Sequence, residues 1–119
     1  QQNALESGQY AFELLNGLKR SQERIGDVRG FGLLLGVELV LDRRTKVPDT
    51  DGAARVMARM KEMGVLISTD GPHRNVLKMK PPICFNAADA EELAKVMGQA
   101  LSELPPLARR ATQSRGETV

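Results

Sequence analysis

The run at residues 33–41 constrains the fold more than any other segment, because it is apolar throughout apart from Gly36 and Glu38. A run of this length that is rich in Leu and Val is typical of a strand buried within a sheet. A central strand needs other strands beside it and a helical layer over it, which the rest of the chain must supply. We therefore predict that residues 33–41 form a central, largely buried strand.

Three segments carry apolar residues at helical spacing and predict amphipathic helices. The first covers about residues 3–22. The second follows the cap-type residues at 48–51 and ends at Gly64, a residue that commonly terminates helices. The third is capped by Asn86 and ends before Pro105-Pro106.

The remaining segments complete a helix, strand, helix, strand, strand, helix order. The glycines of residues 26–32 predict a tight turn that leads into the central strand, whereas residues 65–68 and 76–80 predict short strands. This order predicts an α+β fold, with a small, mainly antiparallel sheet and helices packed on one face. Residues 105–119 offer few groups to bury and predict a disordered tail.

Composition excludes several classes of function. The chain has 119 residues with 17 Lys and Arg against 15 Asp and Glu, and only three Phe and one Tyr, so nucleic-acid binding is not expected. No apolar run reaches the ~20 residues of a membrane helix. The length predicts one domain, and the lack of such a run predicts a soluble protein. A single cysteine fits a reducing compartment, and the sequence leaves open whether the protein belongs to the cytoplasm or the mitochondrion.

The segment at residues 71–82 holds the only histidine and several cations, and is the candidate site. Strand alternation at its centre puts Lys78 and Lys80 on one face, roughly 6 to 7 Å apart at the backbone. Two ammonium groups at that spacing suit a carboxylate or phosphate ligand, and His73 and Arg74 occupy the preceding turn, where binding side chains often lie. The alternative is a solvated strand face, and composition alone leaves both open.

Other candidate sites have ordinary explanations. The glycines at residues 30–36 lead into a strand rather than a helix, which does not match a dinucleotide-binding loop. Cys84, between Ile83 and Phe85, is expected to be a small buried residue rather than a nucleophile, and Asp70 is expected to be a turn residue. One His and one Cys cannot supply a usual metal site, so neither a catalytic constellation nor a metal is predicted.

Taken together, four motifs nevertheless resemble a known family. In order, they are Gly26-Asp27-Val28-Arg29-Gly30-Phe31-Gly32-Leu33, Gly36-Val37-Glu38-Leu39, Gly64-Val65-Leu66 and Val76-Leu77-Lys78-Met79-Lys80-Pro81-Pro82. This set resembles the C-terminal small domain of the class III aminotransferases, which are pyridoxal-phosphate enzymes of fold type I. Residues 68–82 look most similar to the branch that contains ethanolamine-phosphate and 5-phosphohydroxylysine phospho-lyases.

The resemblance implies a domain of a longer protein. Residues 1–104 would be its small domain, with residues 1–22 the end of a connecting helix. The lysine that holds pyridoxal 5'-phosphate would belong to a large domain that precedes this chain, so the chain alone would contain no catalytic or cofactor-binding residue. Its partners would be that large domain and a second subunit of a homodimer or higher oligomer.

The resemblance also implies a role in holding substrate. Many family members carry an arginine at the position of Lys78, where it can pair with a substrate carboxylate. Lysine lacks the planar fork that binds a carboxylate through two parallel hydrogen bonds, so a small phosphorylated amine is the expected substrate. A phospho-lyase would convert it to an aldehyde, ammonia and phosphate, with positive potential from Lys78, Lys80, His73 and Arg74. The alternatives are a conventional class III transaminase and a free-standing anion-binding or interaction domain.

Overall fold

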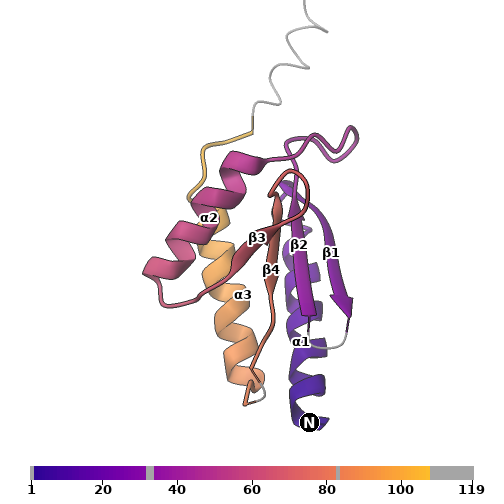
Figure 1. Ribbon diagram of the computed structural model, residues 1–119, viewed down its shortest axis with the longest axis vertical. Helices are drawn as coiled ribbons and strands as arrows, with labels where there is room; N and C mark the ends of the chain where they lie inside the picture. Colours follow the sequence, from indigo (N-terminus) through magenta and orange to yellow (C-terminus); the bar gives the residue numbers. More distant parts are fainter. Residues whose placement is uncertain (1, 32–33, 83, 108–119) are drawn as a thin grey trace, which may run out of the picture.

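A computed structural model describes residues 2–31, 34–82 and 84–107, which form three helices and one four-stranded sheet (Figure 1). Every strand pairing is antiparallel, and the strand order is β1-β2-β4-β3. The elements are α1 (Gln2–Leu18), β1 (Ile25–Phe31), β2 (Leu34–Leu39), α2 (Thr50–Glu62), β3 (Ser68–Asp70), β4 (Val76–Met79) and α3 (Ala87–Ser102).

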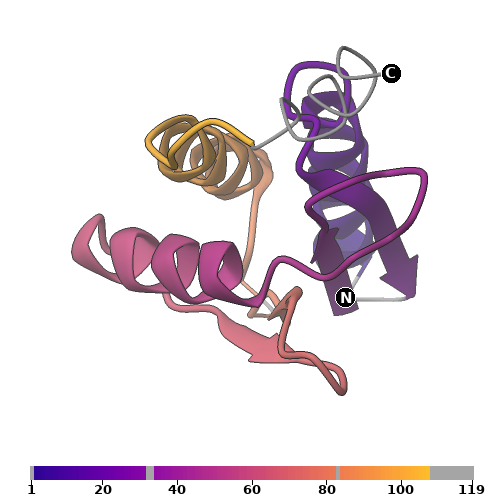
Figure 2. The same ribbon diagram turned by 90° about the horizontal axis from the view of Figure 1, so that it is seen from above.

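All three helices lie on one side of the sheet, which leaves its other face uncovered within the described residues (Figure 2). Helix α1 packs on β1 and β2, whereas α2 packs on β2, β3 and β4. Helix α3 packs against α1 and α2 and so forms the outer part of the helical layer. The predicted α+β architecture is therefore confirmed.

The predicted central strand is β2, which lies between β1 and β4. Its residues Leu35, Val37 and Leu39 are fully or almost fully buried under the helices, whereas Gly36 and Glu38 alternate with them on the uncovered face. Burial on one face of an antiparallel sheet produces this alternation. The strand is thus central, as predicted, but only one of its faces is covered.

The prediction of a turn is wrong for residues 26–31, which belong to the edge strand β1, and residue 32 lies outside the described residues. Its glycines serve close packing. A Cβ on Gly26 would lie 2.9 Å from Cγ1 of Val40, and one on Gly30 would lie 2.9 Å from Cδ1 of Phe12. Larger residues would push β1 away from its neighbours. The glycines that this packing requires give the strand the composition of a turn, which is why the sequence did not predict it.

The helix ends follow the predicted signals at α2 and α3. Asp49 caps α2, and Gly64 follows its C-terminal end with a φ of +91°. Asn86 and Asp89 form a capping box at the start of α3. Helix α1 ends at Leu18, four residues before the predicted end, and the chain continues in turns toward β1.

Candidate functional site

The uncovered face of the sheet carries five charged side chains, which we call the charged face. They lie side by side because directly opposed residues of an antiparallel pair point to the same side. One row across the sheet pairs Asp27 with Glu38 and Val76 with Asp70, and the adjacent row pairs Arg29 with Gly36 and Gly36 with Lys78. The charged face consists of Asp27, Arg29, Glu38, Asp70 and Lys78.

Ion pairs connect these side chains into two groups. Arg29 is shared by two acids, since its Nε lies 3.2 Å from Oδ2 of Asp27 and its Nη2 donates to Oε1 of Glu38. At the other edge of the sheet, Nζ of Lys78 lies 3.5 Å from Oδ2 of Asp70. Each described cation of the charged face therefore already has at least one carboxylate partner.

The carboxylate of Asp70 remains ionised under most conditions. A hydrogen bond from the backbone N–H of Gly71 and the nearby charge of Lys78 hold the pKa of Asp70 below its usual value, and Arg74 adds to this effect. Gly71 supports the turn with a φ of +88°, a conformation that favours glycine.

The structure does not bring the four predicted site residues to one point. Lys78 lies in β4 on the charged face, and its side chain is 42% exposed. His73 and Arg74 lie in the turn that precedes β4, whereas Lys80 follows the end of β4 at Met79. A strand of four residues is about 13 Å long, so His73 and Lys80 lie near opposite ends of the strand.

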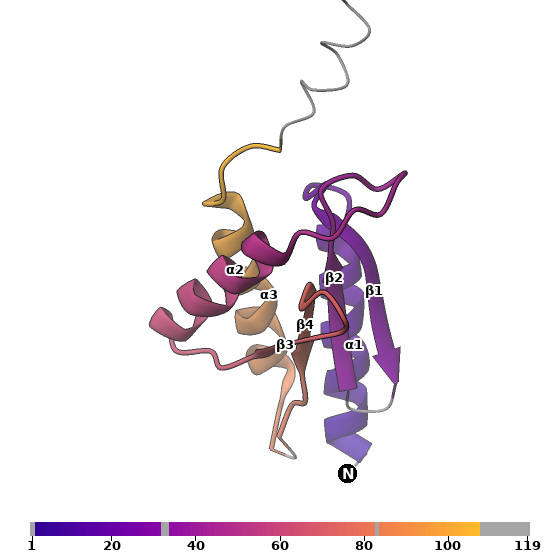
Figure 3. The same cartoon turned by 45° about the horizontal axis from the view of Figure 1, so that its top comes forward.

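His73 and Arg74 belong to a turn beside the start of α2 (Figure 3). The hydroxyl of Thr50 donates to the carbonyl of His73 at 2.6 Å, and Arg74 adopts a φ of +50°. The buried side chain of Asn75 donates to the carbonyl of Leu39, which fixes the turn against the end of β2. A hollow of about 390 Å³ next to this turn is lined by residues that include Arg29, Glu38, Lys46, Asp70, Pro72 and His73.

Lys80 lines a different hollow, of about 460 Å³, that also contains Leu66 and Cys84. Leu66 is 78% exposed, and the charged residues Asp89 and Glu92 also line this hollow, so its surface is mixed in character. Cys84 is exposed, and the prediction that it would be buried is wrong. Pro81 and Phe85 are the buried residues of this segment, whereas Cys84 lines the hollow at the surface.

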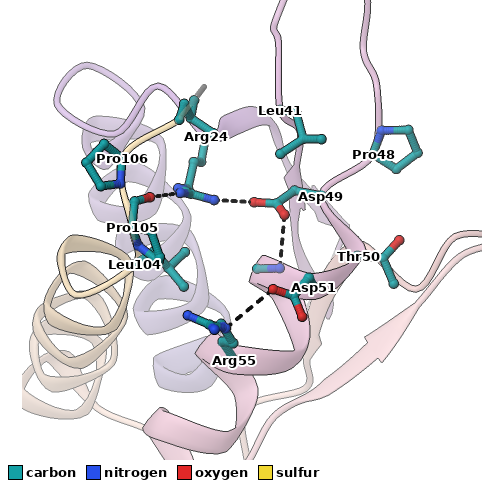
Figure 4. A pocket seen from close by; sticks show the side chains of 12 residues that line it. Arg24, Leu41, Pro48, Asp49, Thr50, Asp51, Arg55, Leu104, Pro105 and Pro106 are labelled. Carbon is teal, nitrogen blue, oxygen red and sulfur yellow. Dashed lines mark hydrogen bonds and ion pairs between the residues drawn. The ribbon is translucent and has the colours of Figure 1, made fainter. Parts of the chain in front are cut away.

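A third hollow, of about 470 Å³, lies where α2 begins and α3 has ended (Figure 4). Nη1 of Arg24 lies 2.5 Å from Oδ2 of Asp49, and Nη2 of Arg24 donates to the carbonyl of Pro105. Asp49 also accepts the backbone N–H of Gly52 at 2.9 Å. These partners all come from the chain itself, so we assign Arg24 and Asp49 to structural support rather than to ligand binding.

Asp70 is the residue that sequence reasoning missed. The sequence places it in a turn, whereas the structure places it in β3, on the same face as Lys78. The structure's hairpin register opposes Ser68 to Lys78, so strand alternation puts Asp70 and Lys78 on one face. The sequence does not contain this register, so it gives no signal that pairs the two residues.

The sequence comparison with known families decides the relationship. A model of the family Aminotransferase class-III matches residues 1–101. The chain belongs to the class III aminotransferases. Enzymes of this family depend on pyridoxal phosphate, and phospho-lyases and transaminases are both among its relatives.

Individual relatives match most of this chain but only part of their own length. "Alanine--glyoxylate aminotransferase 2-like" of Drosophila melanogaster is 46% identical over 94% of this chain and 24% of its own length. "Ethanolamine-phosphate phospho-lyase homolog 1" of Caenorhabditis elegans is 42% identical over 85% of this chain and 23% of its own length. The chain therefore spans about a quarter of the length of the relatives it matches.

Solved structures give the same relationship. A phospholyase from Arthrobacter in complex with phosphoethanolamine superimposes with a TM-score of 0.80 at 34% identity, over 87% of this chain and 24% of that one. A transaminase from the marine bacterium Virgibacillus superimposes with a TM-score of 0.78 at 28% identity, over 85% of this chain and 24% of that one.

The described residues do not fit a cofactor or metal site. None of their lysines is buried, and Lys78 is already paired with Asp70, so no enclosed amine is available to hold a carbonyl cofactor. Within the described residues, no three His, Cys, Asp or Glu side chains are grouped to hold a metal ion. None of the described helices has the length and apolar character to cross a bilayer.

Proposed function

We propose that this chain is the substrate-holding small domain of a pyridoxal-phosphate-dependent phospho-lyase that acts on a small phosphorylated amine. Residues 1–104 form that domain, and Lys78 provides the cation that attracts the substrate's phosphate. Lys80 and Arg74 add positive charge at the two ends of β4, and His73 is a further substrate-holding residue beside Arg74. The chain contributes no catalytic residue of its own.

The observation that carries this proposal is the lysine on the charged face. Lys78 occupies the position where many family members have an arginine, and its half-exposed ammonium points away from the helical layer. A compact ammonium group binds phosphate as a point charge, whereas the planar guanidinium of arginine favours the two oxygens of a carboxylate. The substitution therefore favours a phosphate over an α-carboxylate as the group held here.

Two relatives support the same branch. The solved phospholyase from Arthrobacter was captured with phosphoethanolamine, and it is more similar to this chain, at 34% identity, than the Virgibacillus transaminase, at 28%. The Caenorhabditis elegans phospho-lyase homolog adds a second relative with this name, at 42% identity.

A conventional transaminase is the second candidate. It is favoured by the Drosophila relative and by "Alanine--glyoxylate aminotransferase 2 homolog 2, mitochondrial" of Arabidopsis thaliana, which is 47% identical over 87% of this chain and 22% of its own length. Under either candidate, residues outside this chain bind pyridoxal 5'-phosphate. The large domain and a second subunit are then the partners of this domain.

The test uses the full-length protein that contains this chain, supplied with pyridoxal 5'-phosphate and either phosphoethanolamine or phosphohydroxylysine. We expect release of inorganic phosphate together with ammonia. Transamination of an amino acid without phosphate release would reject the phospho-lyase in favour of the transaminase.

The Lys78→Ala variant tests the residue. Loss of one charge-assisted contact predicts a fall in kcat/KM of about tenfold or more, with an unchanged cofactor absorption spectrum. Lys61→Ala is the matched control, because Lys61 is an exposed lysine in the last turn of α2, on the helical side of the sheet. If Lys78→Ala and the wild type had equal kcat/KM, Lys78 would have no part in substrate binding.

A further inference from the structure

The pair Lys78 and Asp70 differs from the other ion pairs of the charged face. Arg29 is held between two acids, Asp27 and Glu38, and cannot leave either without loss. Lys78 has one described carboxylate partner, Asp70, at 3.5 Å, and the side chains are 42% and 60% exposed. A single contact at this exposure is weak and exchanges rapidly, because exposed side chains change rotamer within nanoseconds.

The carboxylate of Asp70 does not need Lys78 in order to stay ionised. The largest cause of the lowered pKa of Asp70 is the hydrogen bond from the backbone N–H of Gly71, which does not depend on Lys78. If the ammonium moves to another anion, the Asp70 carboxylate, whose side chain is 60% exposed, remains hydrated and ionised near neutral pH. The pair therefore has two accessible arrangements, with Lys78 either on Asp70 or on an incoming anion.

We propose that Asp70 is the resident counter-ion of Lys78, which gives up the ammonium when a phosphate group binds and reclaims it when phosphate leaves. This inference rests on the proposed function and adds a second residue to the same site. Asp70 does not contact the reacting atoms, and it acts through Lys78 as a positioning residue. Its effect is to weaken binding of phosphate, both by competing for the ammonium and by repelling the ligand, so that product is released readily.

The charge of the ligand gives this proposal a distinctive signature. A fixed negative charge repels a dianion about twice as strongly as a monoanion at the same place, since Coulomb energy is proportional to charge. Removing the Asp70 charge should therefore strengthen binding of a dianion more than binding of a monoanion of the same shape. A purely structural role for Asp70 would not produce this dependence.

The experiment measures binding at Lys78 itself in the full-length holoenzyme at pH 7.5. Reductive methylation of Lys78 is followed by peptide mass spectrometry while methyl phosphate, largely a dianion, or methyl sulfate, a monoanion, is titrated in. Lys61 serves as the internal reference, because it is exposed and lies on α2. The concentration that half-protects Lys78 gives the dissociation constant without any turnover.

In the Asp70→Asn variant we expect the dissociation constant of methyl phosphate to fall about fivefold, and that of methyl sulfate about twofold. Asp70→Glu keeps the charge and should remain close to wild type. Asp27→Asn removes an equal charge from the same face, but its described partner is Arg29, so its effect should be smaller.

The outcomes separate the two proposals. If methyl phosphate does not protect Lys78 in the wild type, the assignment of Lys78 in the proposed function fails, and this inference fails with it. If protection occurs but Asp70→Asn leaves both dissociation constants unchanged, or raises them, only the counter-ion role of Asp70 is overturned. If Asp70→Asn does not fold, Asp70→Glu decides. This variant keeps the charge, so a dissociation constant of methyl phosphate close to wild type supports the counter-ion role, and one far from wild type contradicts it.

Discussion

At the scale of single residues, Asp49 ties the start of α2 to the segment before β1. Its buried carboxylate accepts the N–H of Gly52 at the start of α2 and pairs with Arg24, which also donates to the carbonyl of Pro105 (Figure 4). A half-satisfied buried carboxylate is costly, so these contacts depend on one another. Gly52 is part of the arrangement, because a Cβ there would lie 2.2 Å from Oδ2 of Asp49.

Gly52→Ala should therefore destabilise the protein, although alanine is the better helix former. The new methyl group displaces the Asp49 carboxylate, so the helix cap is lost and the pair with Arg24 is disturbed. We expect a loss of about 2 kcal/mol in the free energy of unfolding, measured by urea denaturation. Gly17→Ala in α1 is the control, since no atom lies within 4 Å of the new Cβ, and it should be neutral or stabilising.

The sequence predicts local roles of residues well and their distant partners poorly. Asp49 stands among the cap-type residues before α2, and its cap is confirmed. Its pairing with Arg24, 25 residues away, depends on where the fold places the segments that precede β1 and α2, which no local pattern contains. Cys84 and Asp70 were misjudged for the same reason: burial and ion pairing at both positions are set by the fold around them.

At the scale of elements, the helices were predictable, whereas β1 was missed and β3 was misplaced. A strand was predicted at residues 65–68, and the structure has it at Ser68–Asp70. Amphipathic periodicity identifies all three helices, because a helix buries one stripe of its own sequence, and capping residues also mark the starts of α2 and α3. Strand β1 carries Gly26 and Gly30 where it touches Val40 and Phe12, so its composition is that of a turn. Whether such glycines break a strand or allow it to pack is decided by the neighbouring elements.

Helices α2 and α3 are joined by Arg59 and Glu103. Nε of Arg59 donates to Oε1 of Glu103 at 2.7 Å, and Gln99 donates to Oε2 at 2.7 Å. Glu103 caps the C-terminal end of α3, where a negative charge opposes the helix dipole, so the cation of Arg59 also compensates that repulsion. The hydrogen bond from Arg59, followed by that from Gln99, lowers the pKa of Glu103.

Glu103→Gln should lower the melting temperature at pH 7, and the difference from wild type should shrink in acid. Because the folded pKa of Glu103 is below its ordinary value of 4.5, the stabilisation is complete well above pH 4.5 and is lost as pH falls through the folded pKa. Thermal unfolding followed by circular dichroism between pH 7 and pH 3 measures this. Glu62→Gln keeps the pair of Arg59 with Glu103 and should have a smaller effect. A difference that persists undiminished at pH 3 would contradict the assignment.

At the scale of the whole molecule, the two residues of the pair Lys78 and Asp70 stand on strands that are unequally supported by the fold. Strands β2 and β4 are central and bury Val37 and Leu77 completely under the helices. Strand β3 is an edge strand of three residues, of which Ser68 and Asp70 are exposed. The charged partner of Lys78 therefore stands on the least supported strand, whereas Lys78 itself stands on a central one.

Hydrogen exchange should reveal this gradient. We expect the backbone amides of β2, and those of β4 that pair with it, to exchange at least about tenfold more slowly than the amides of β3, because edge strands open without disturbing the core. Strand β1 is the matched edge strand, and its packing against α1 should place it between the two. Equal protection of β3 and β2 would show that the edge is as rigid as the centre. A softer β3 lets Asp70 move while Lys78 stays in place, which is the motion that an exchange of counter-ion requires.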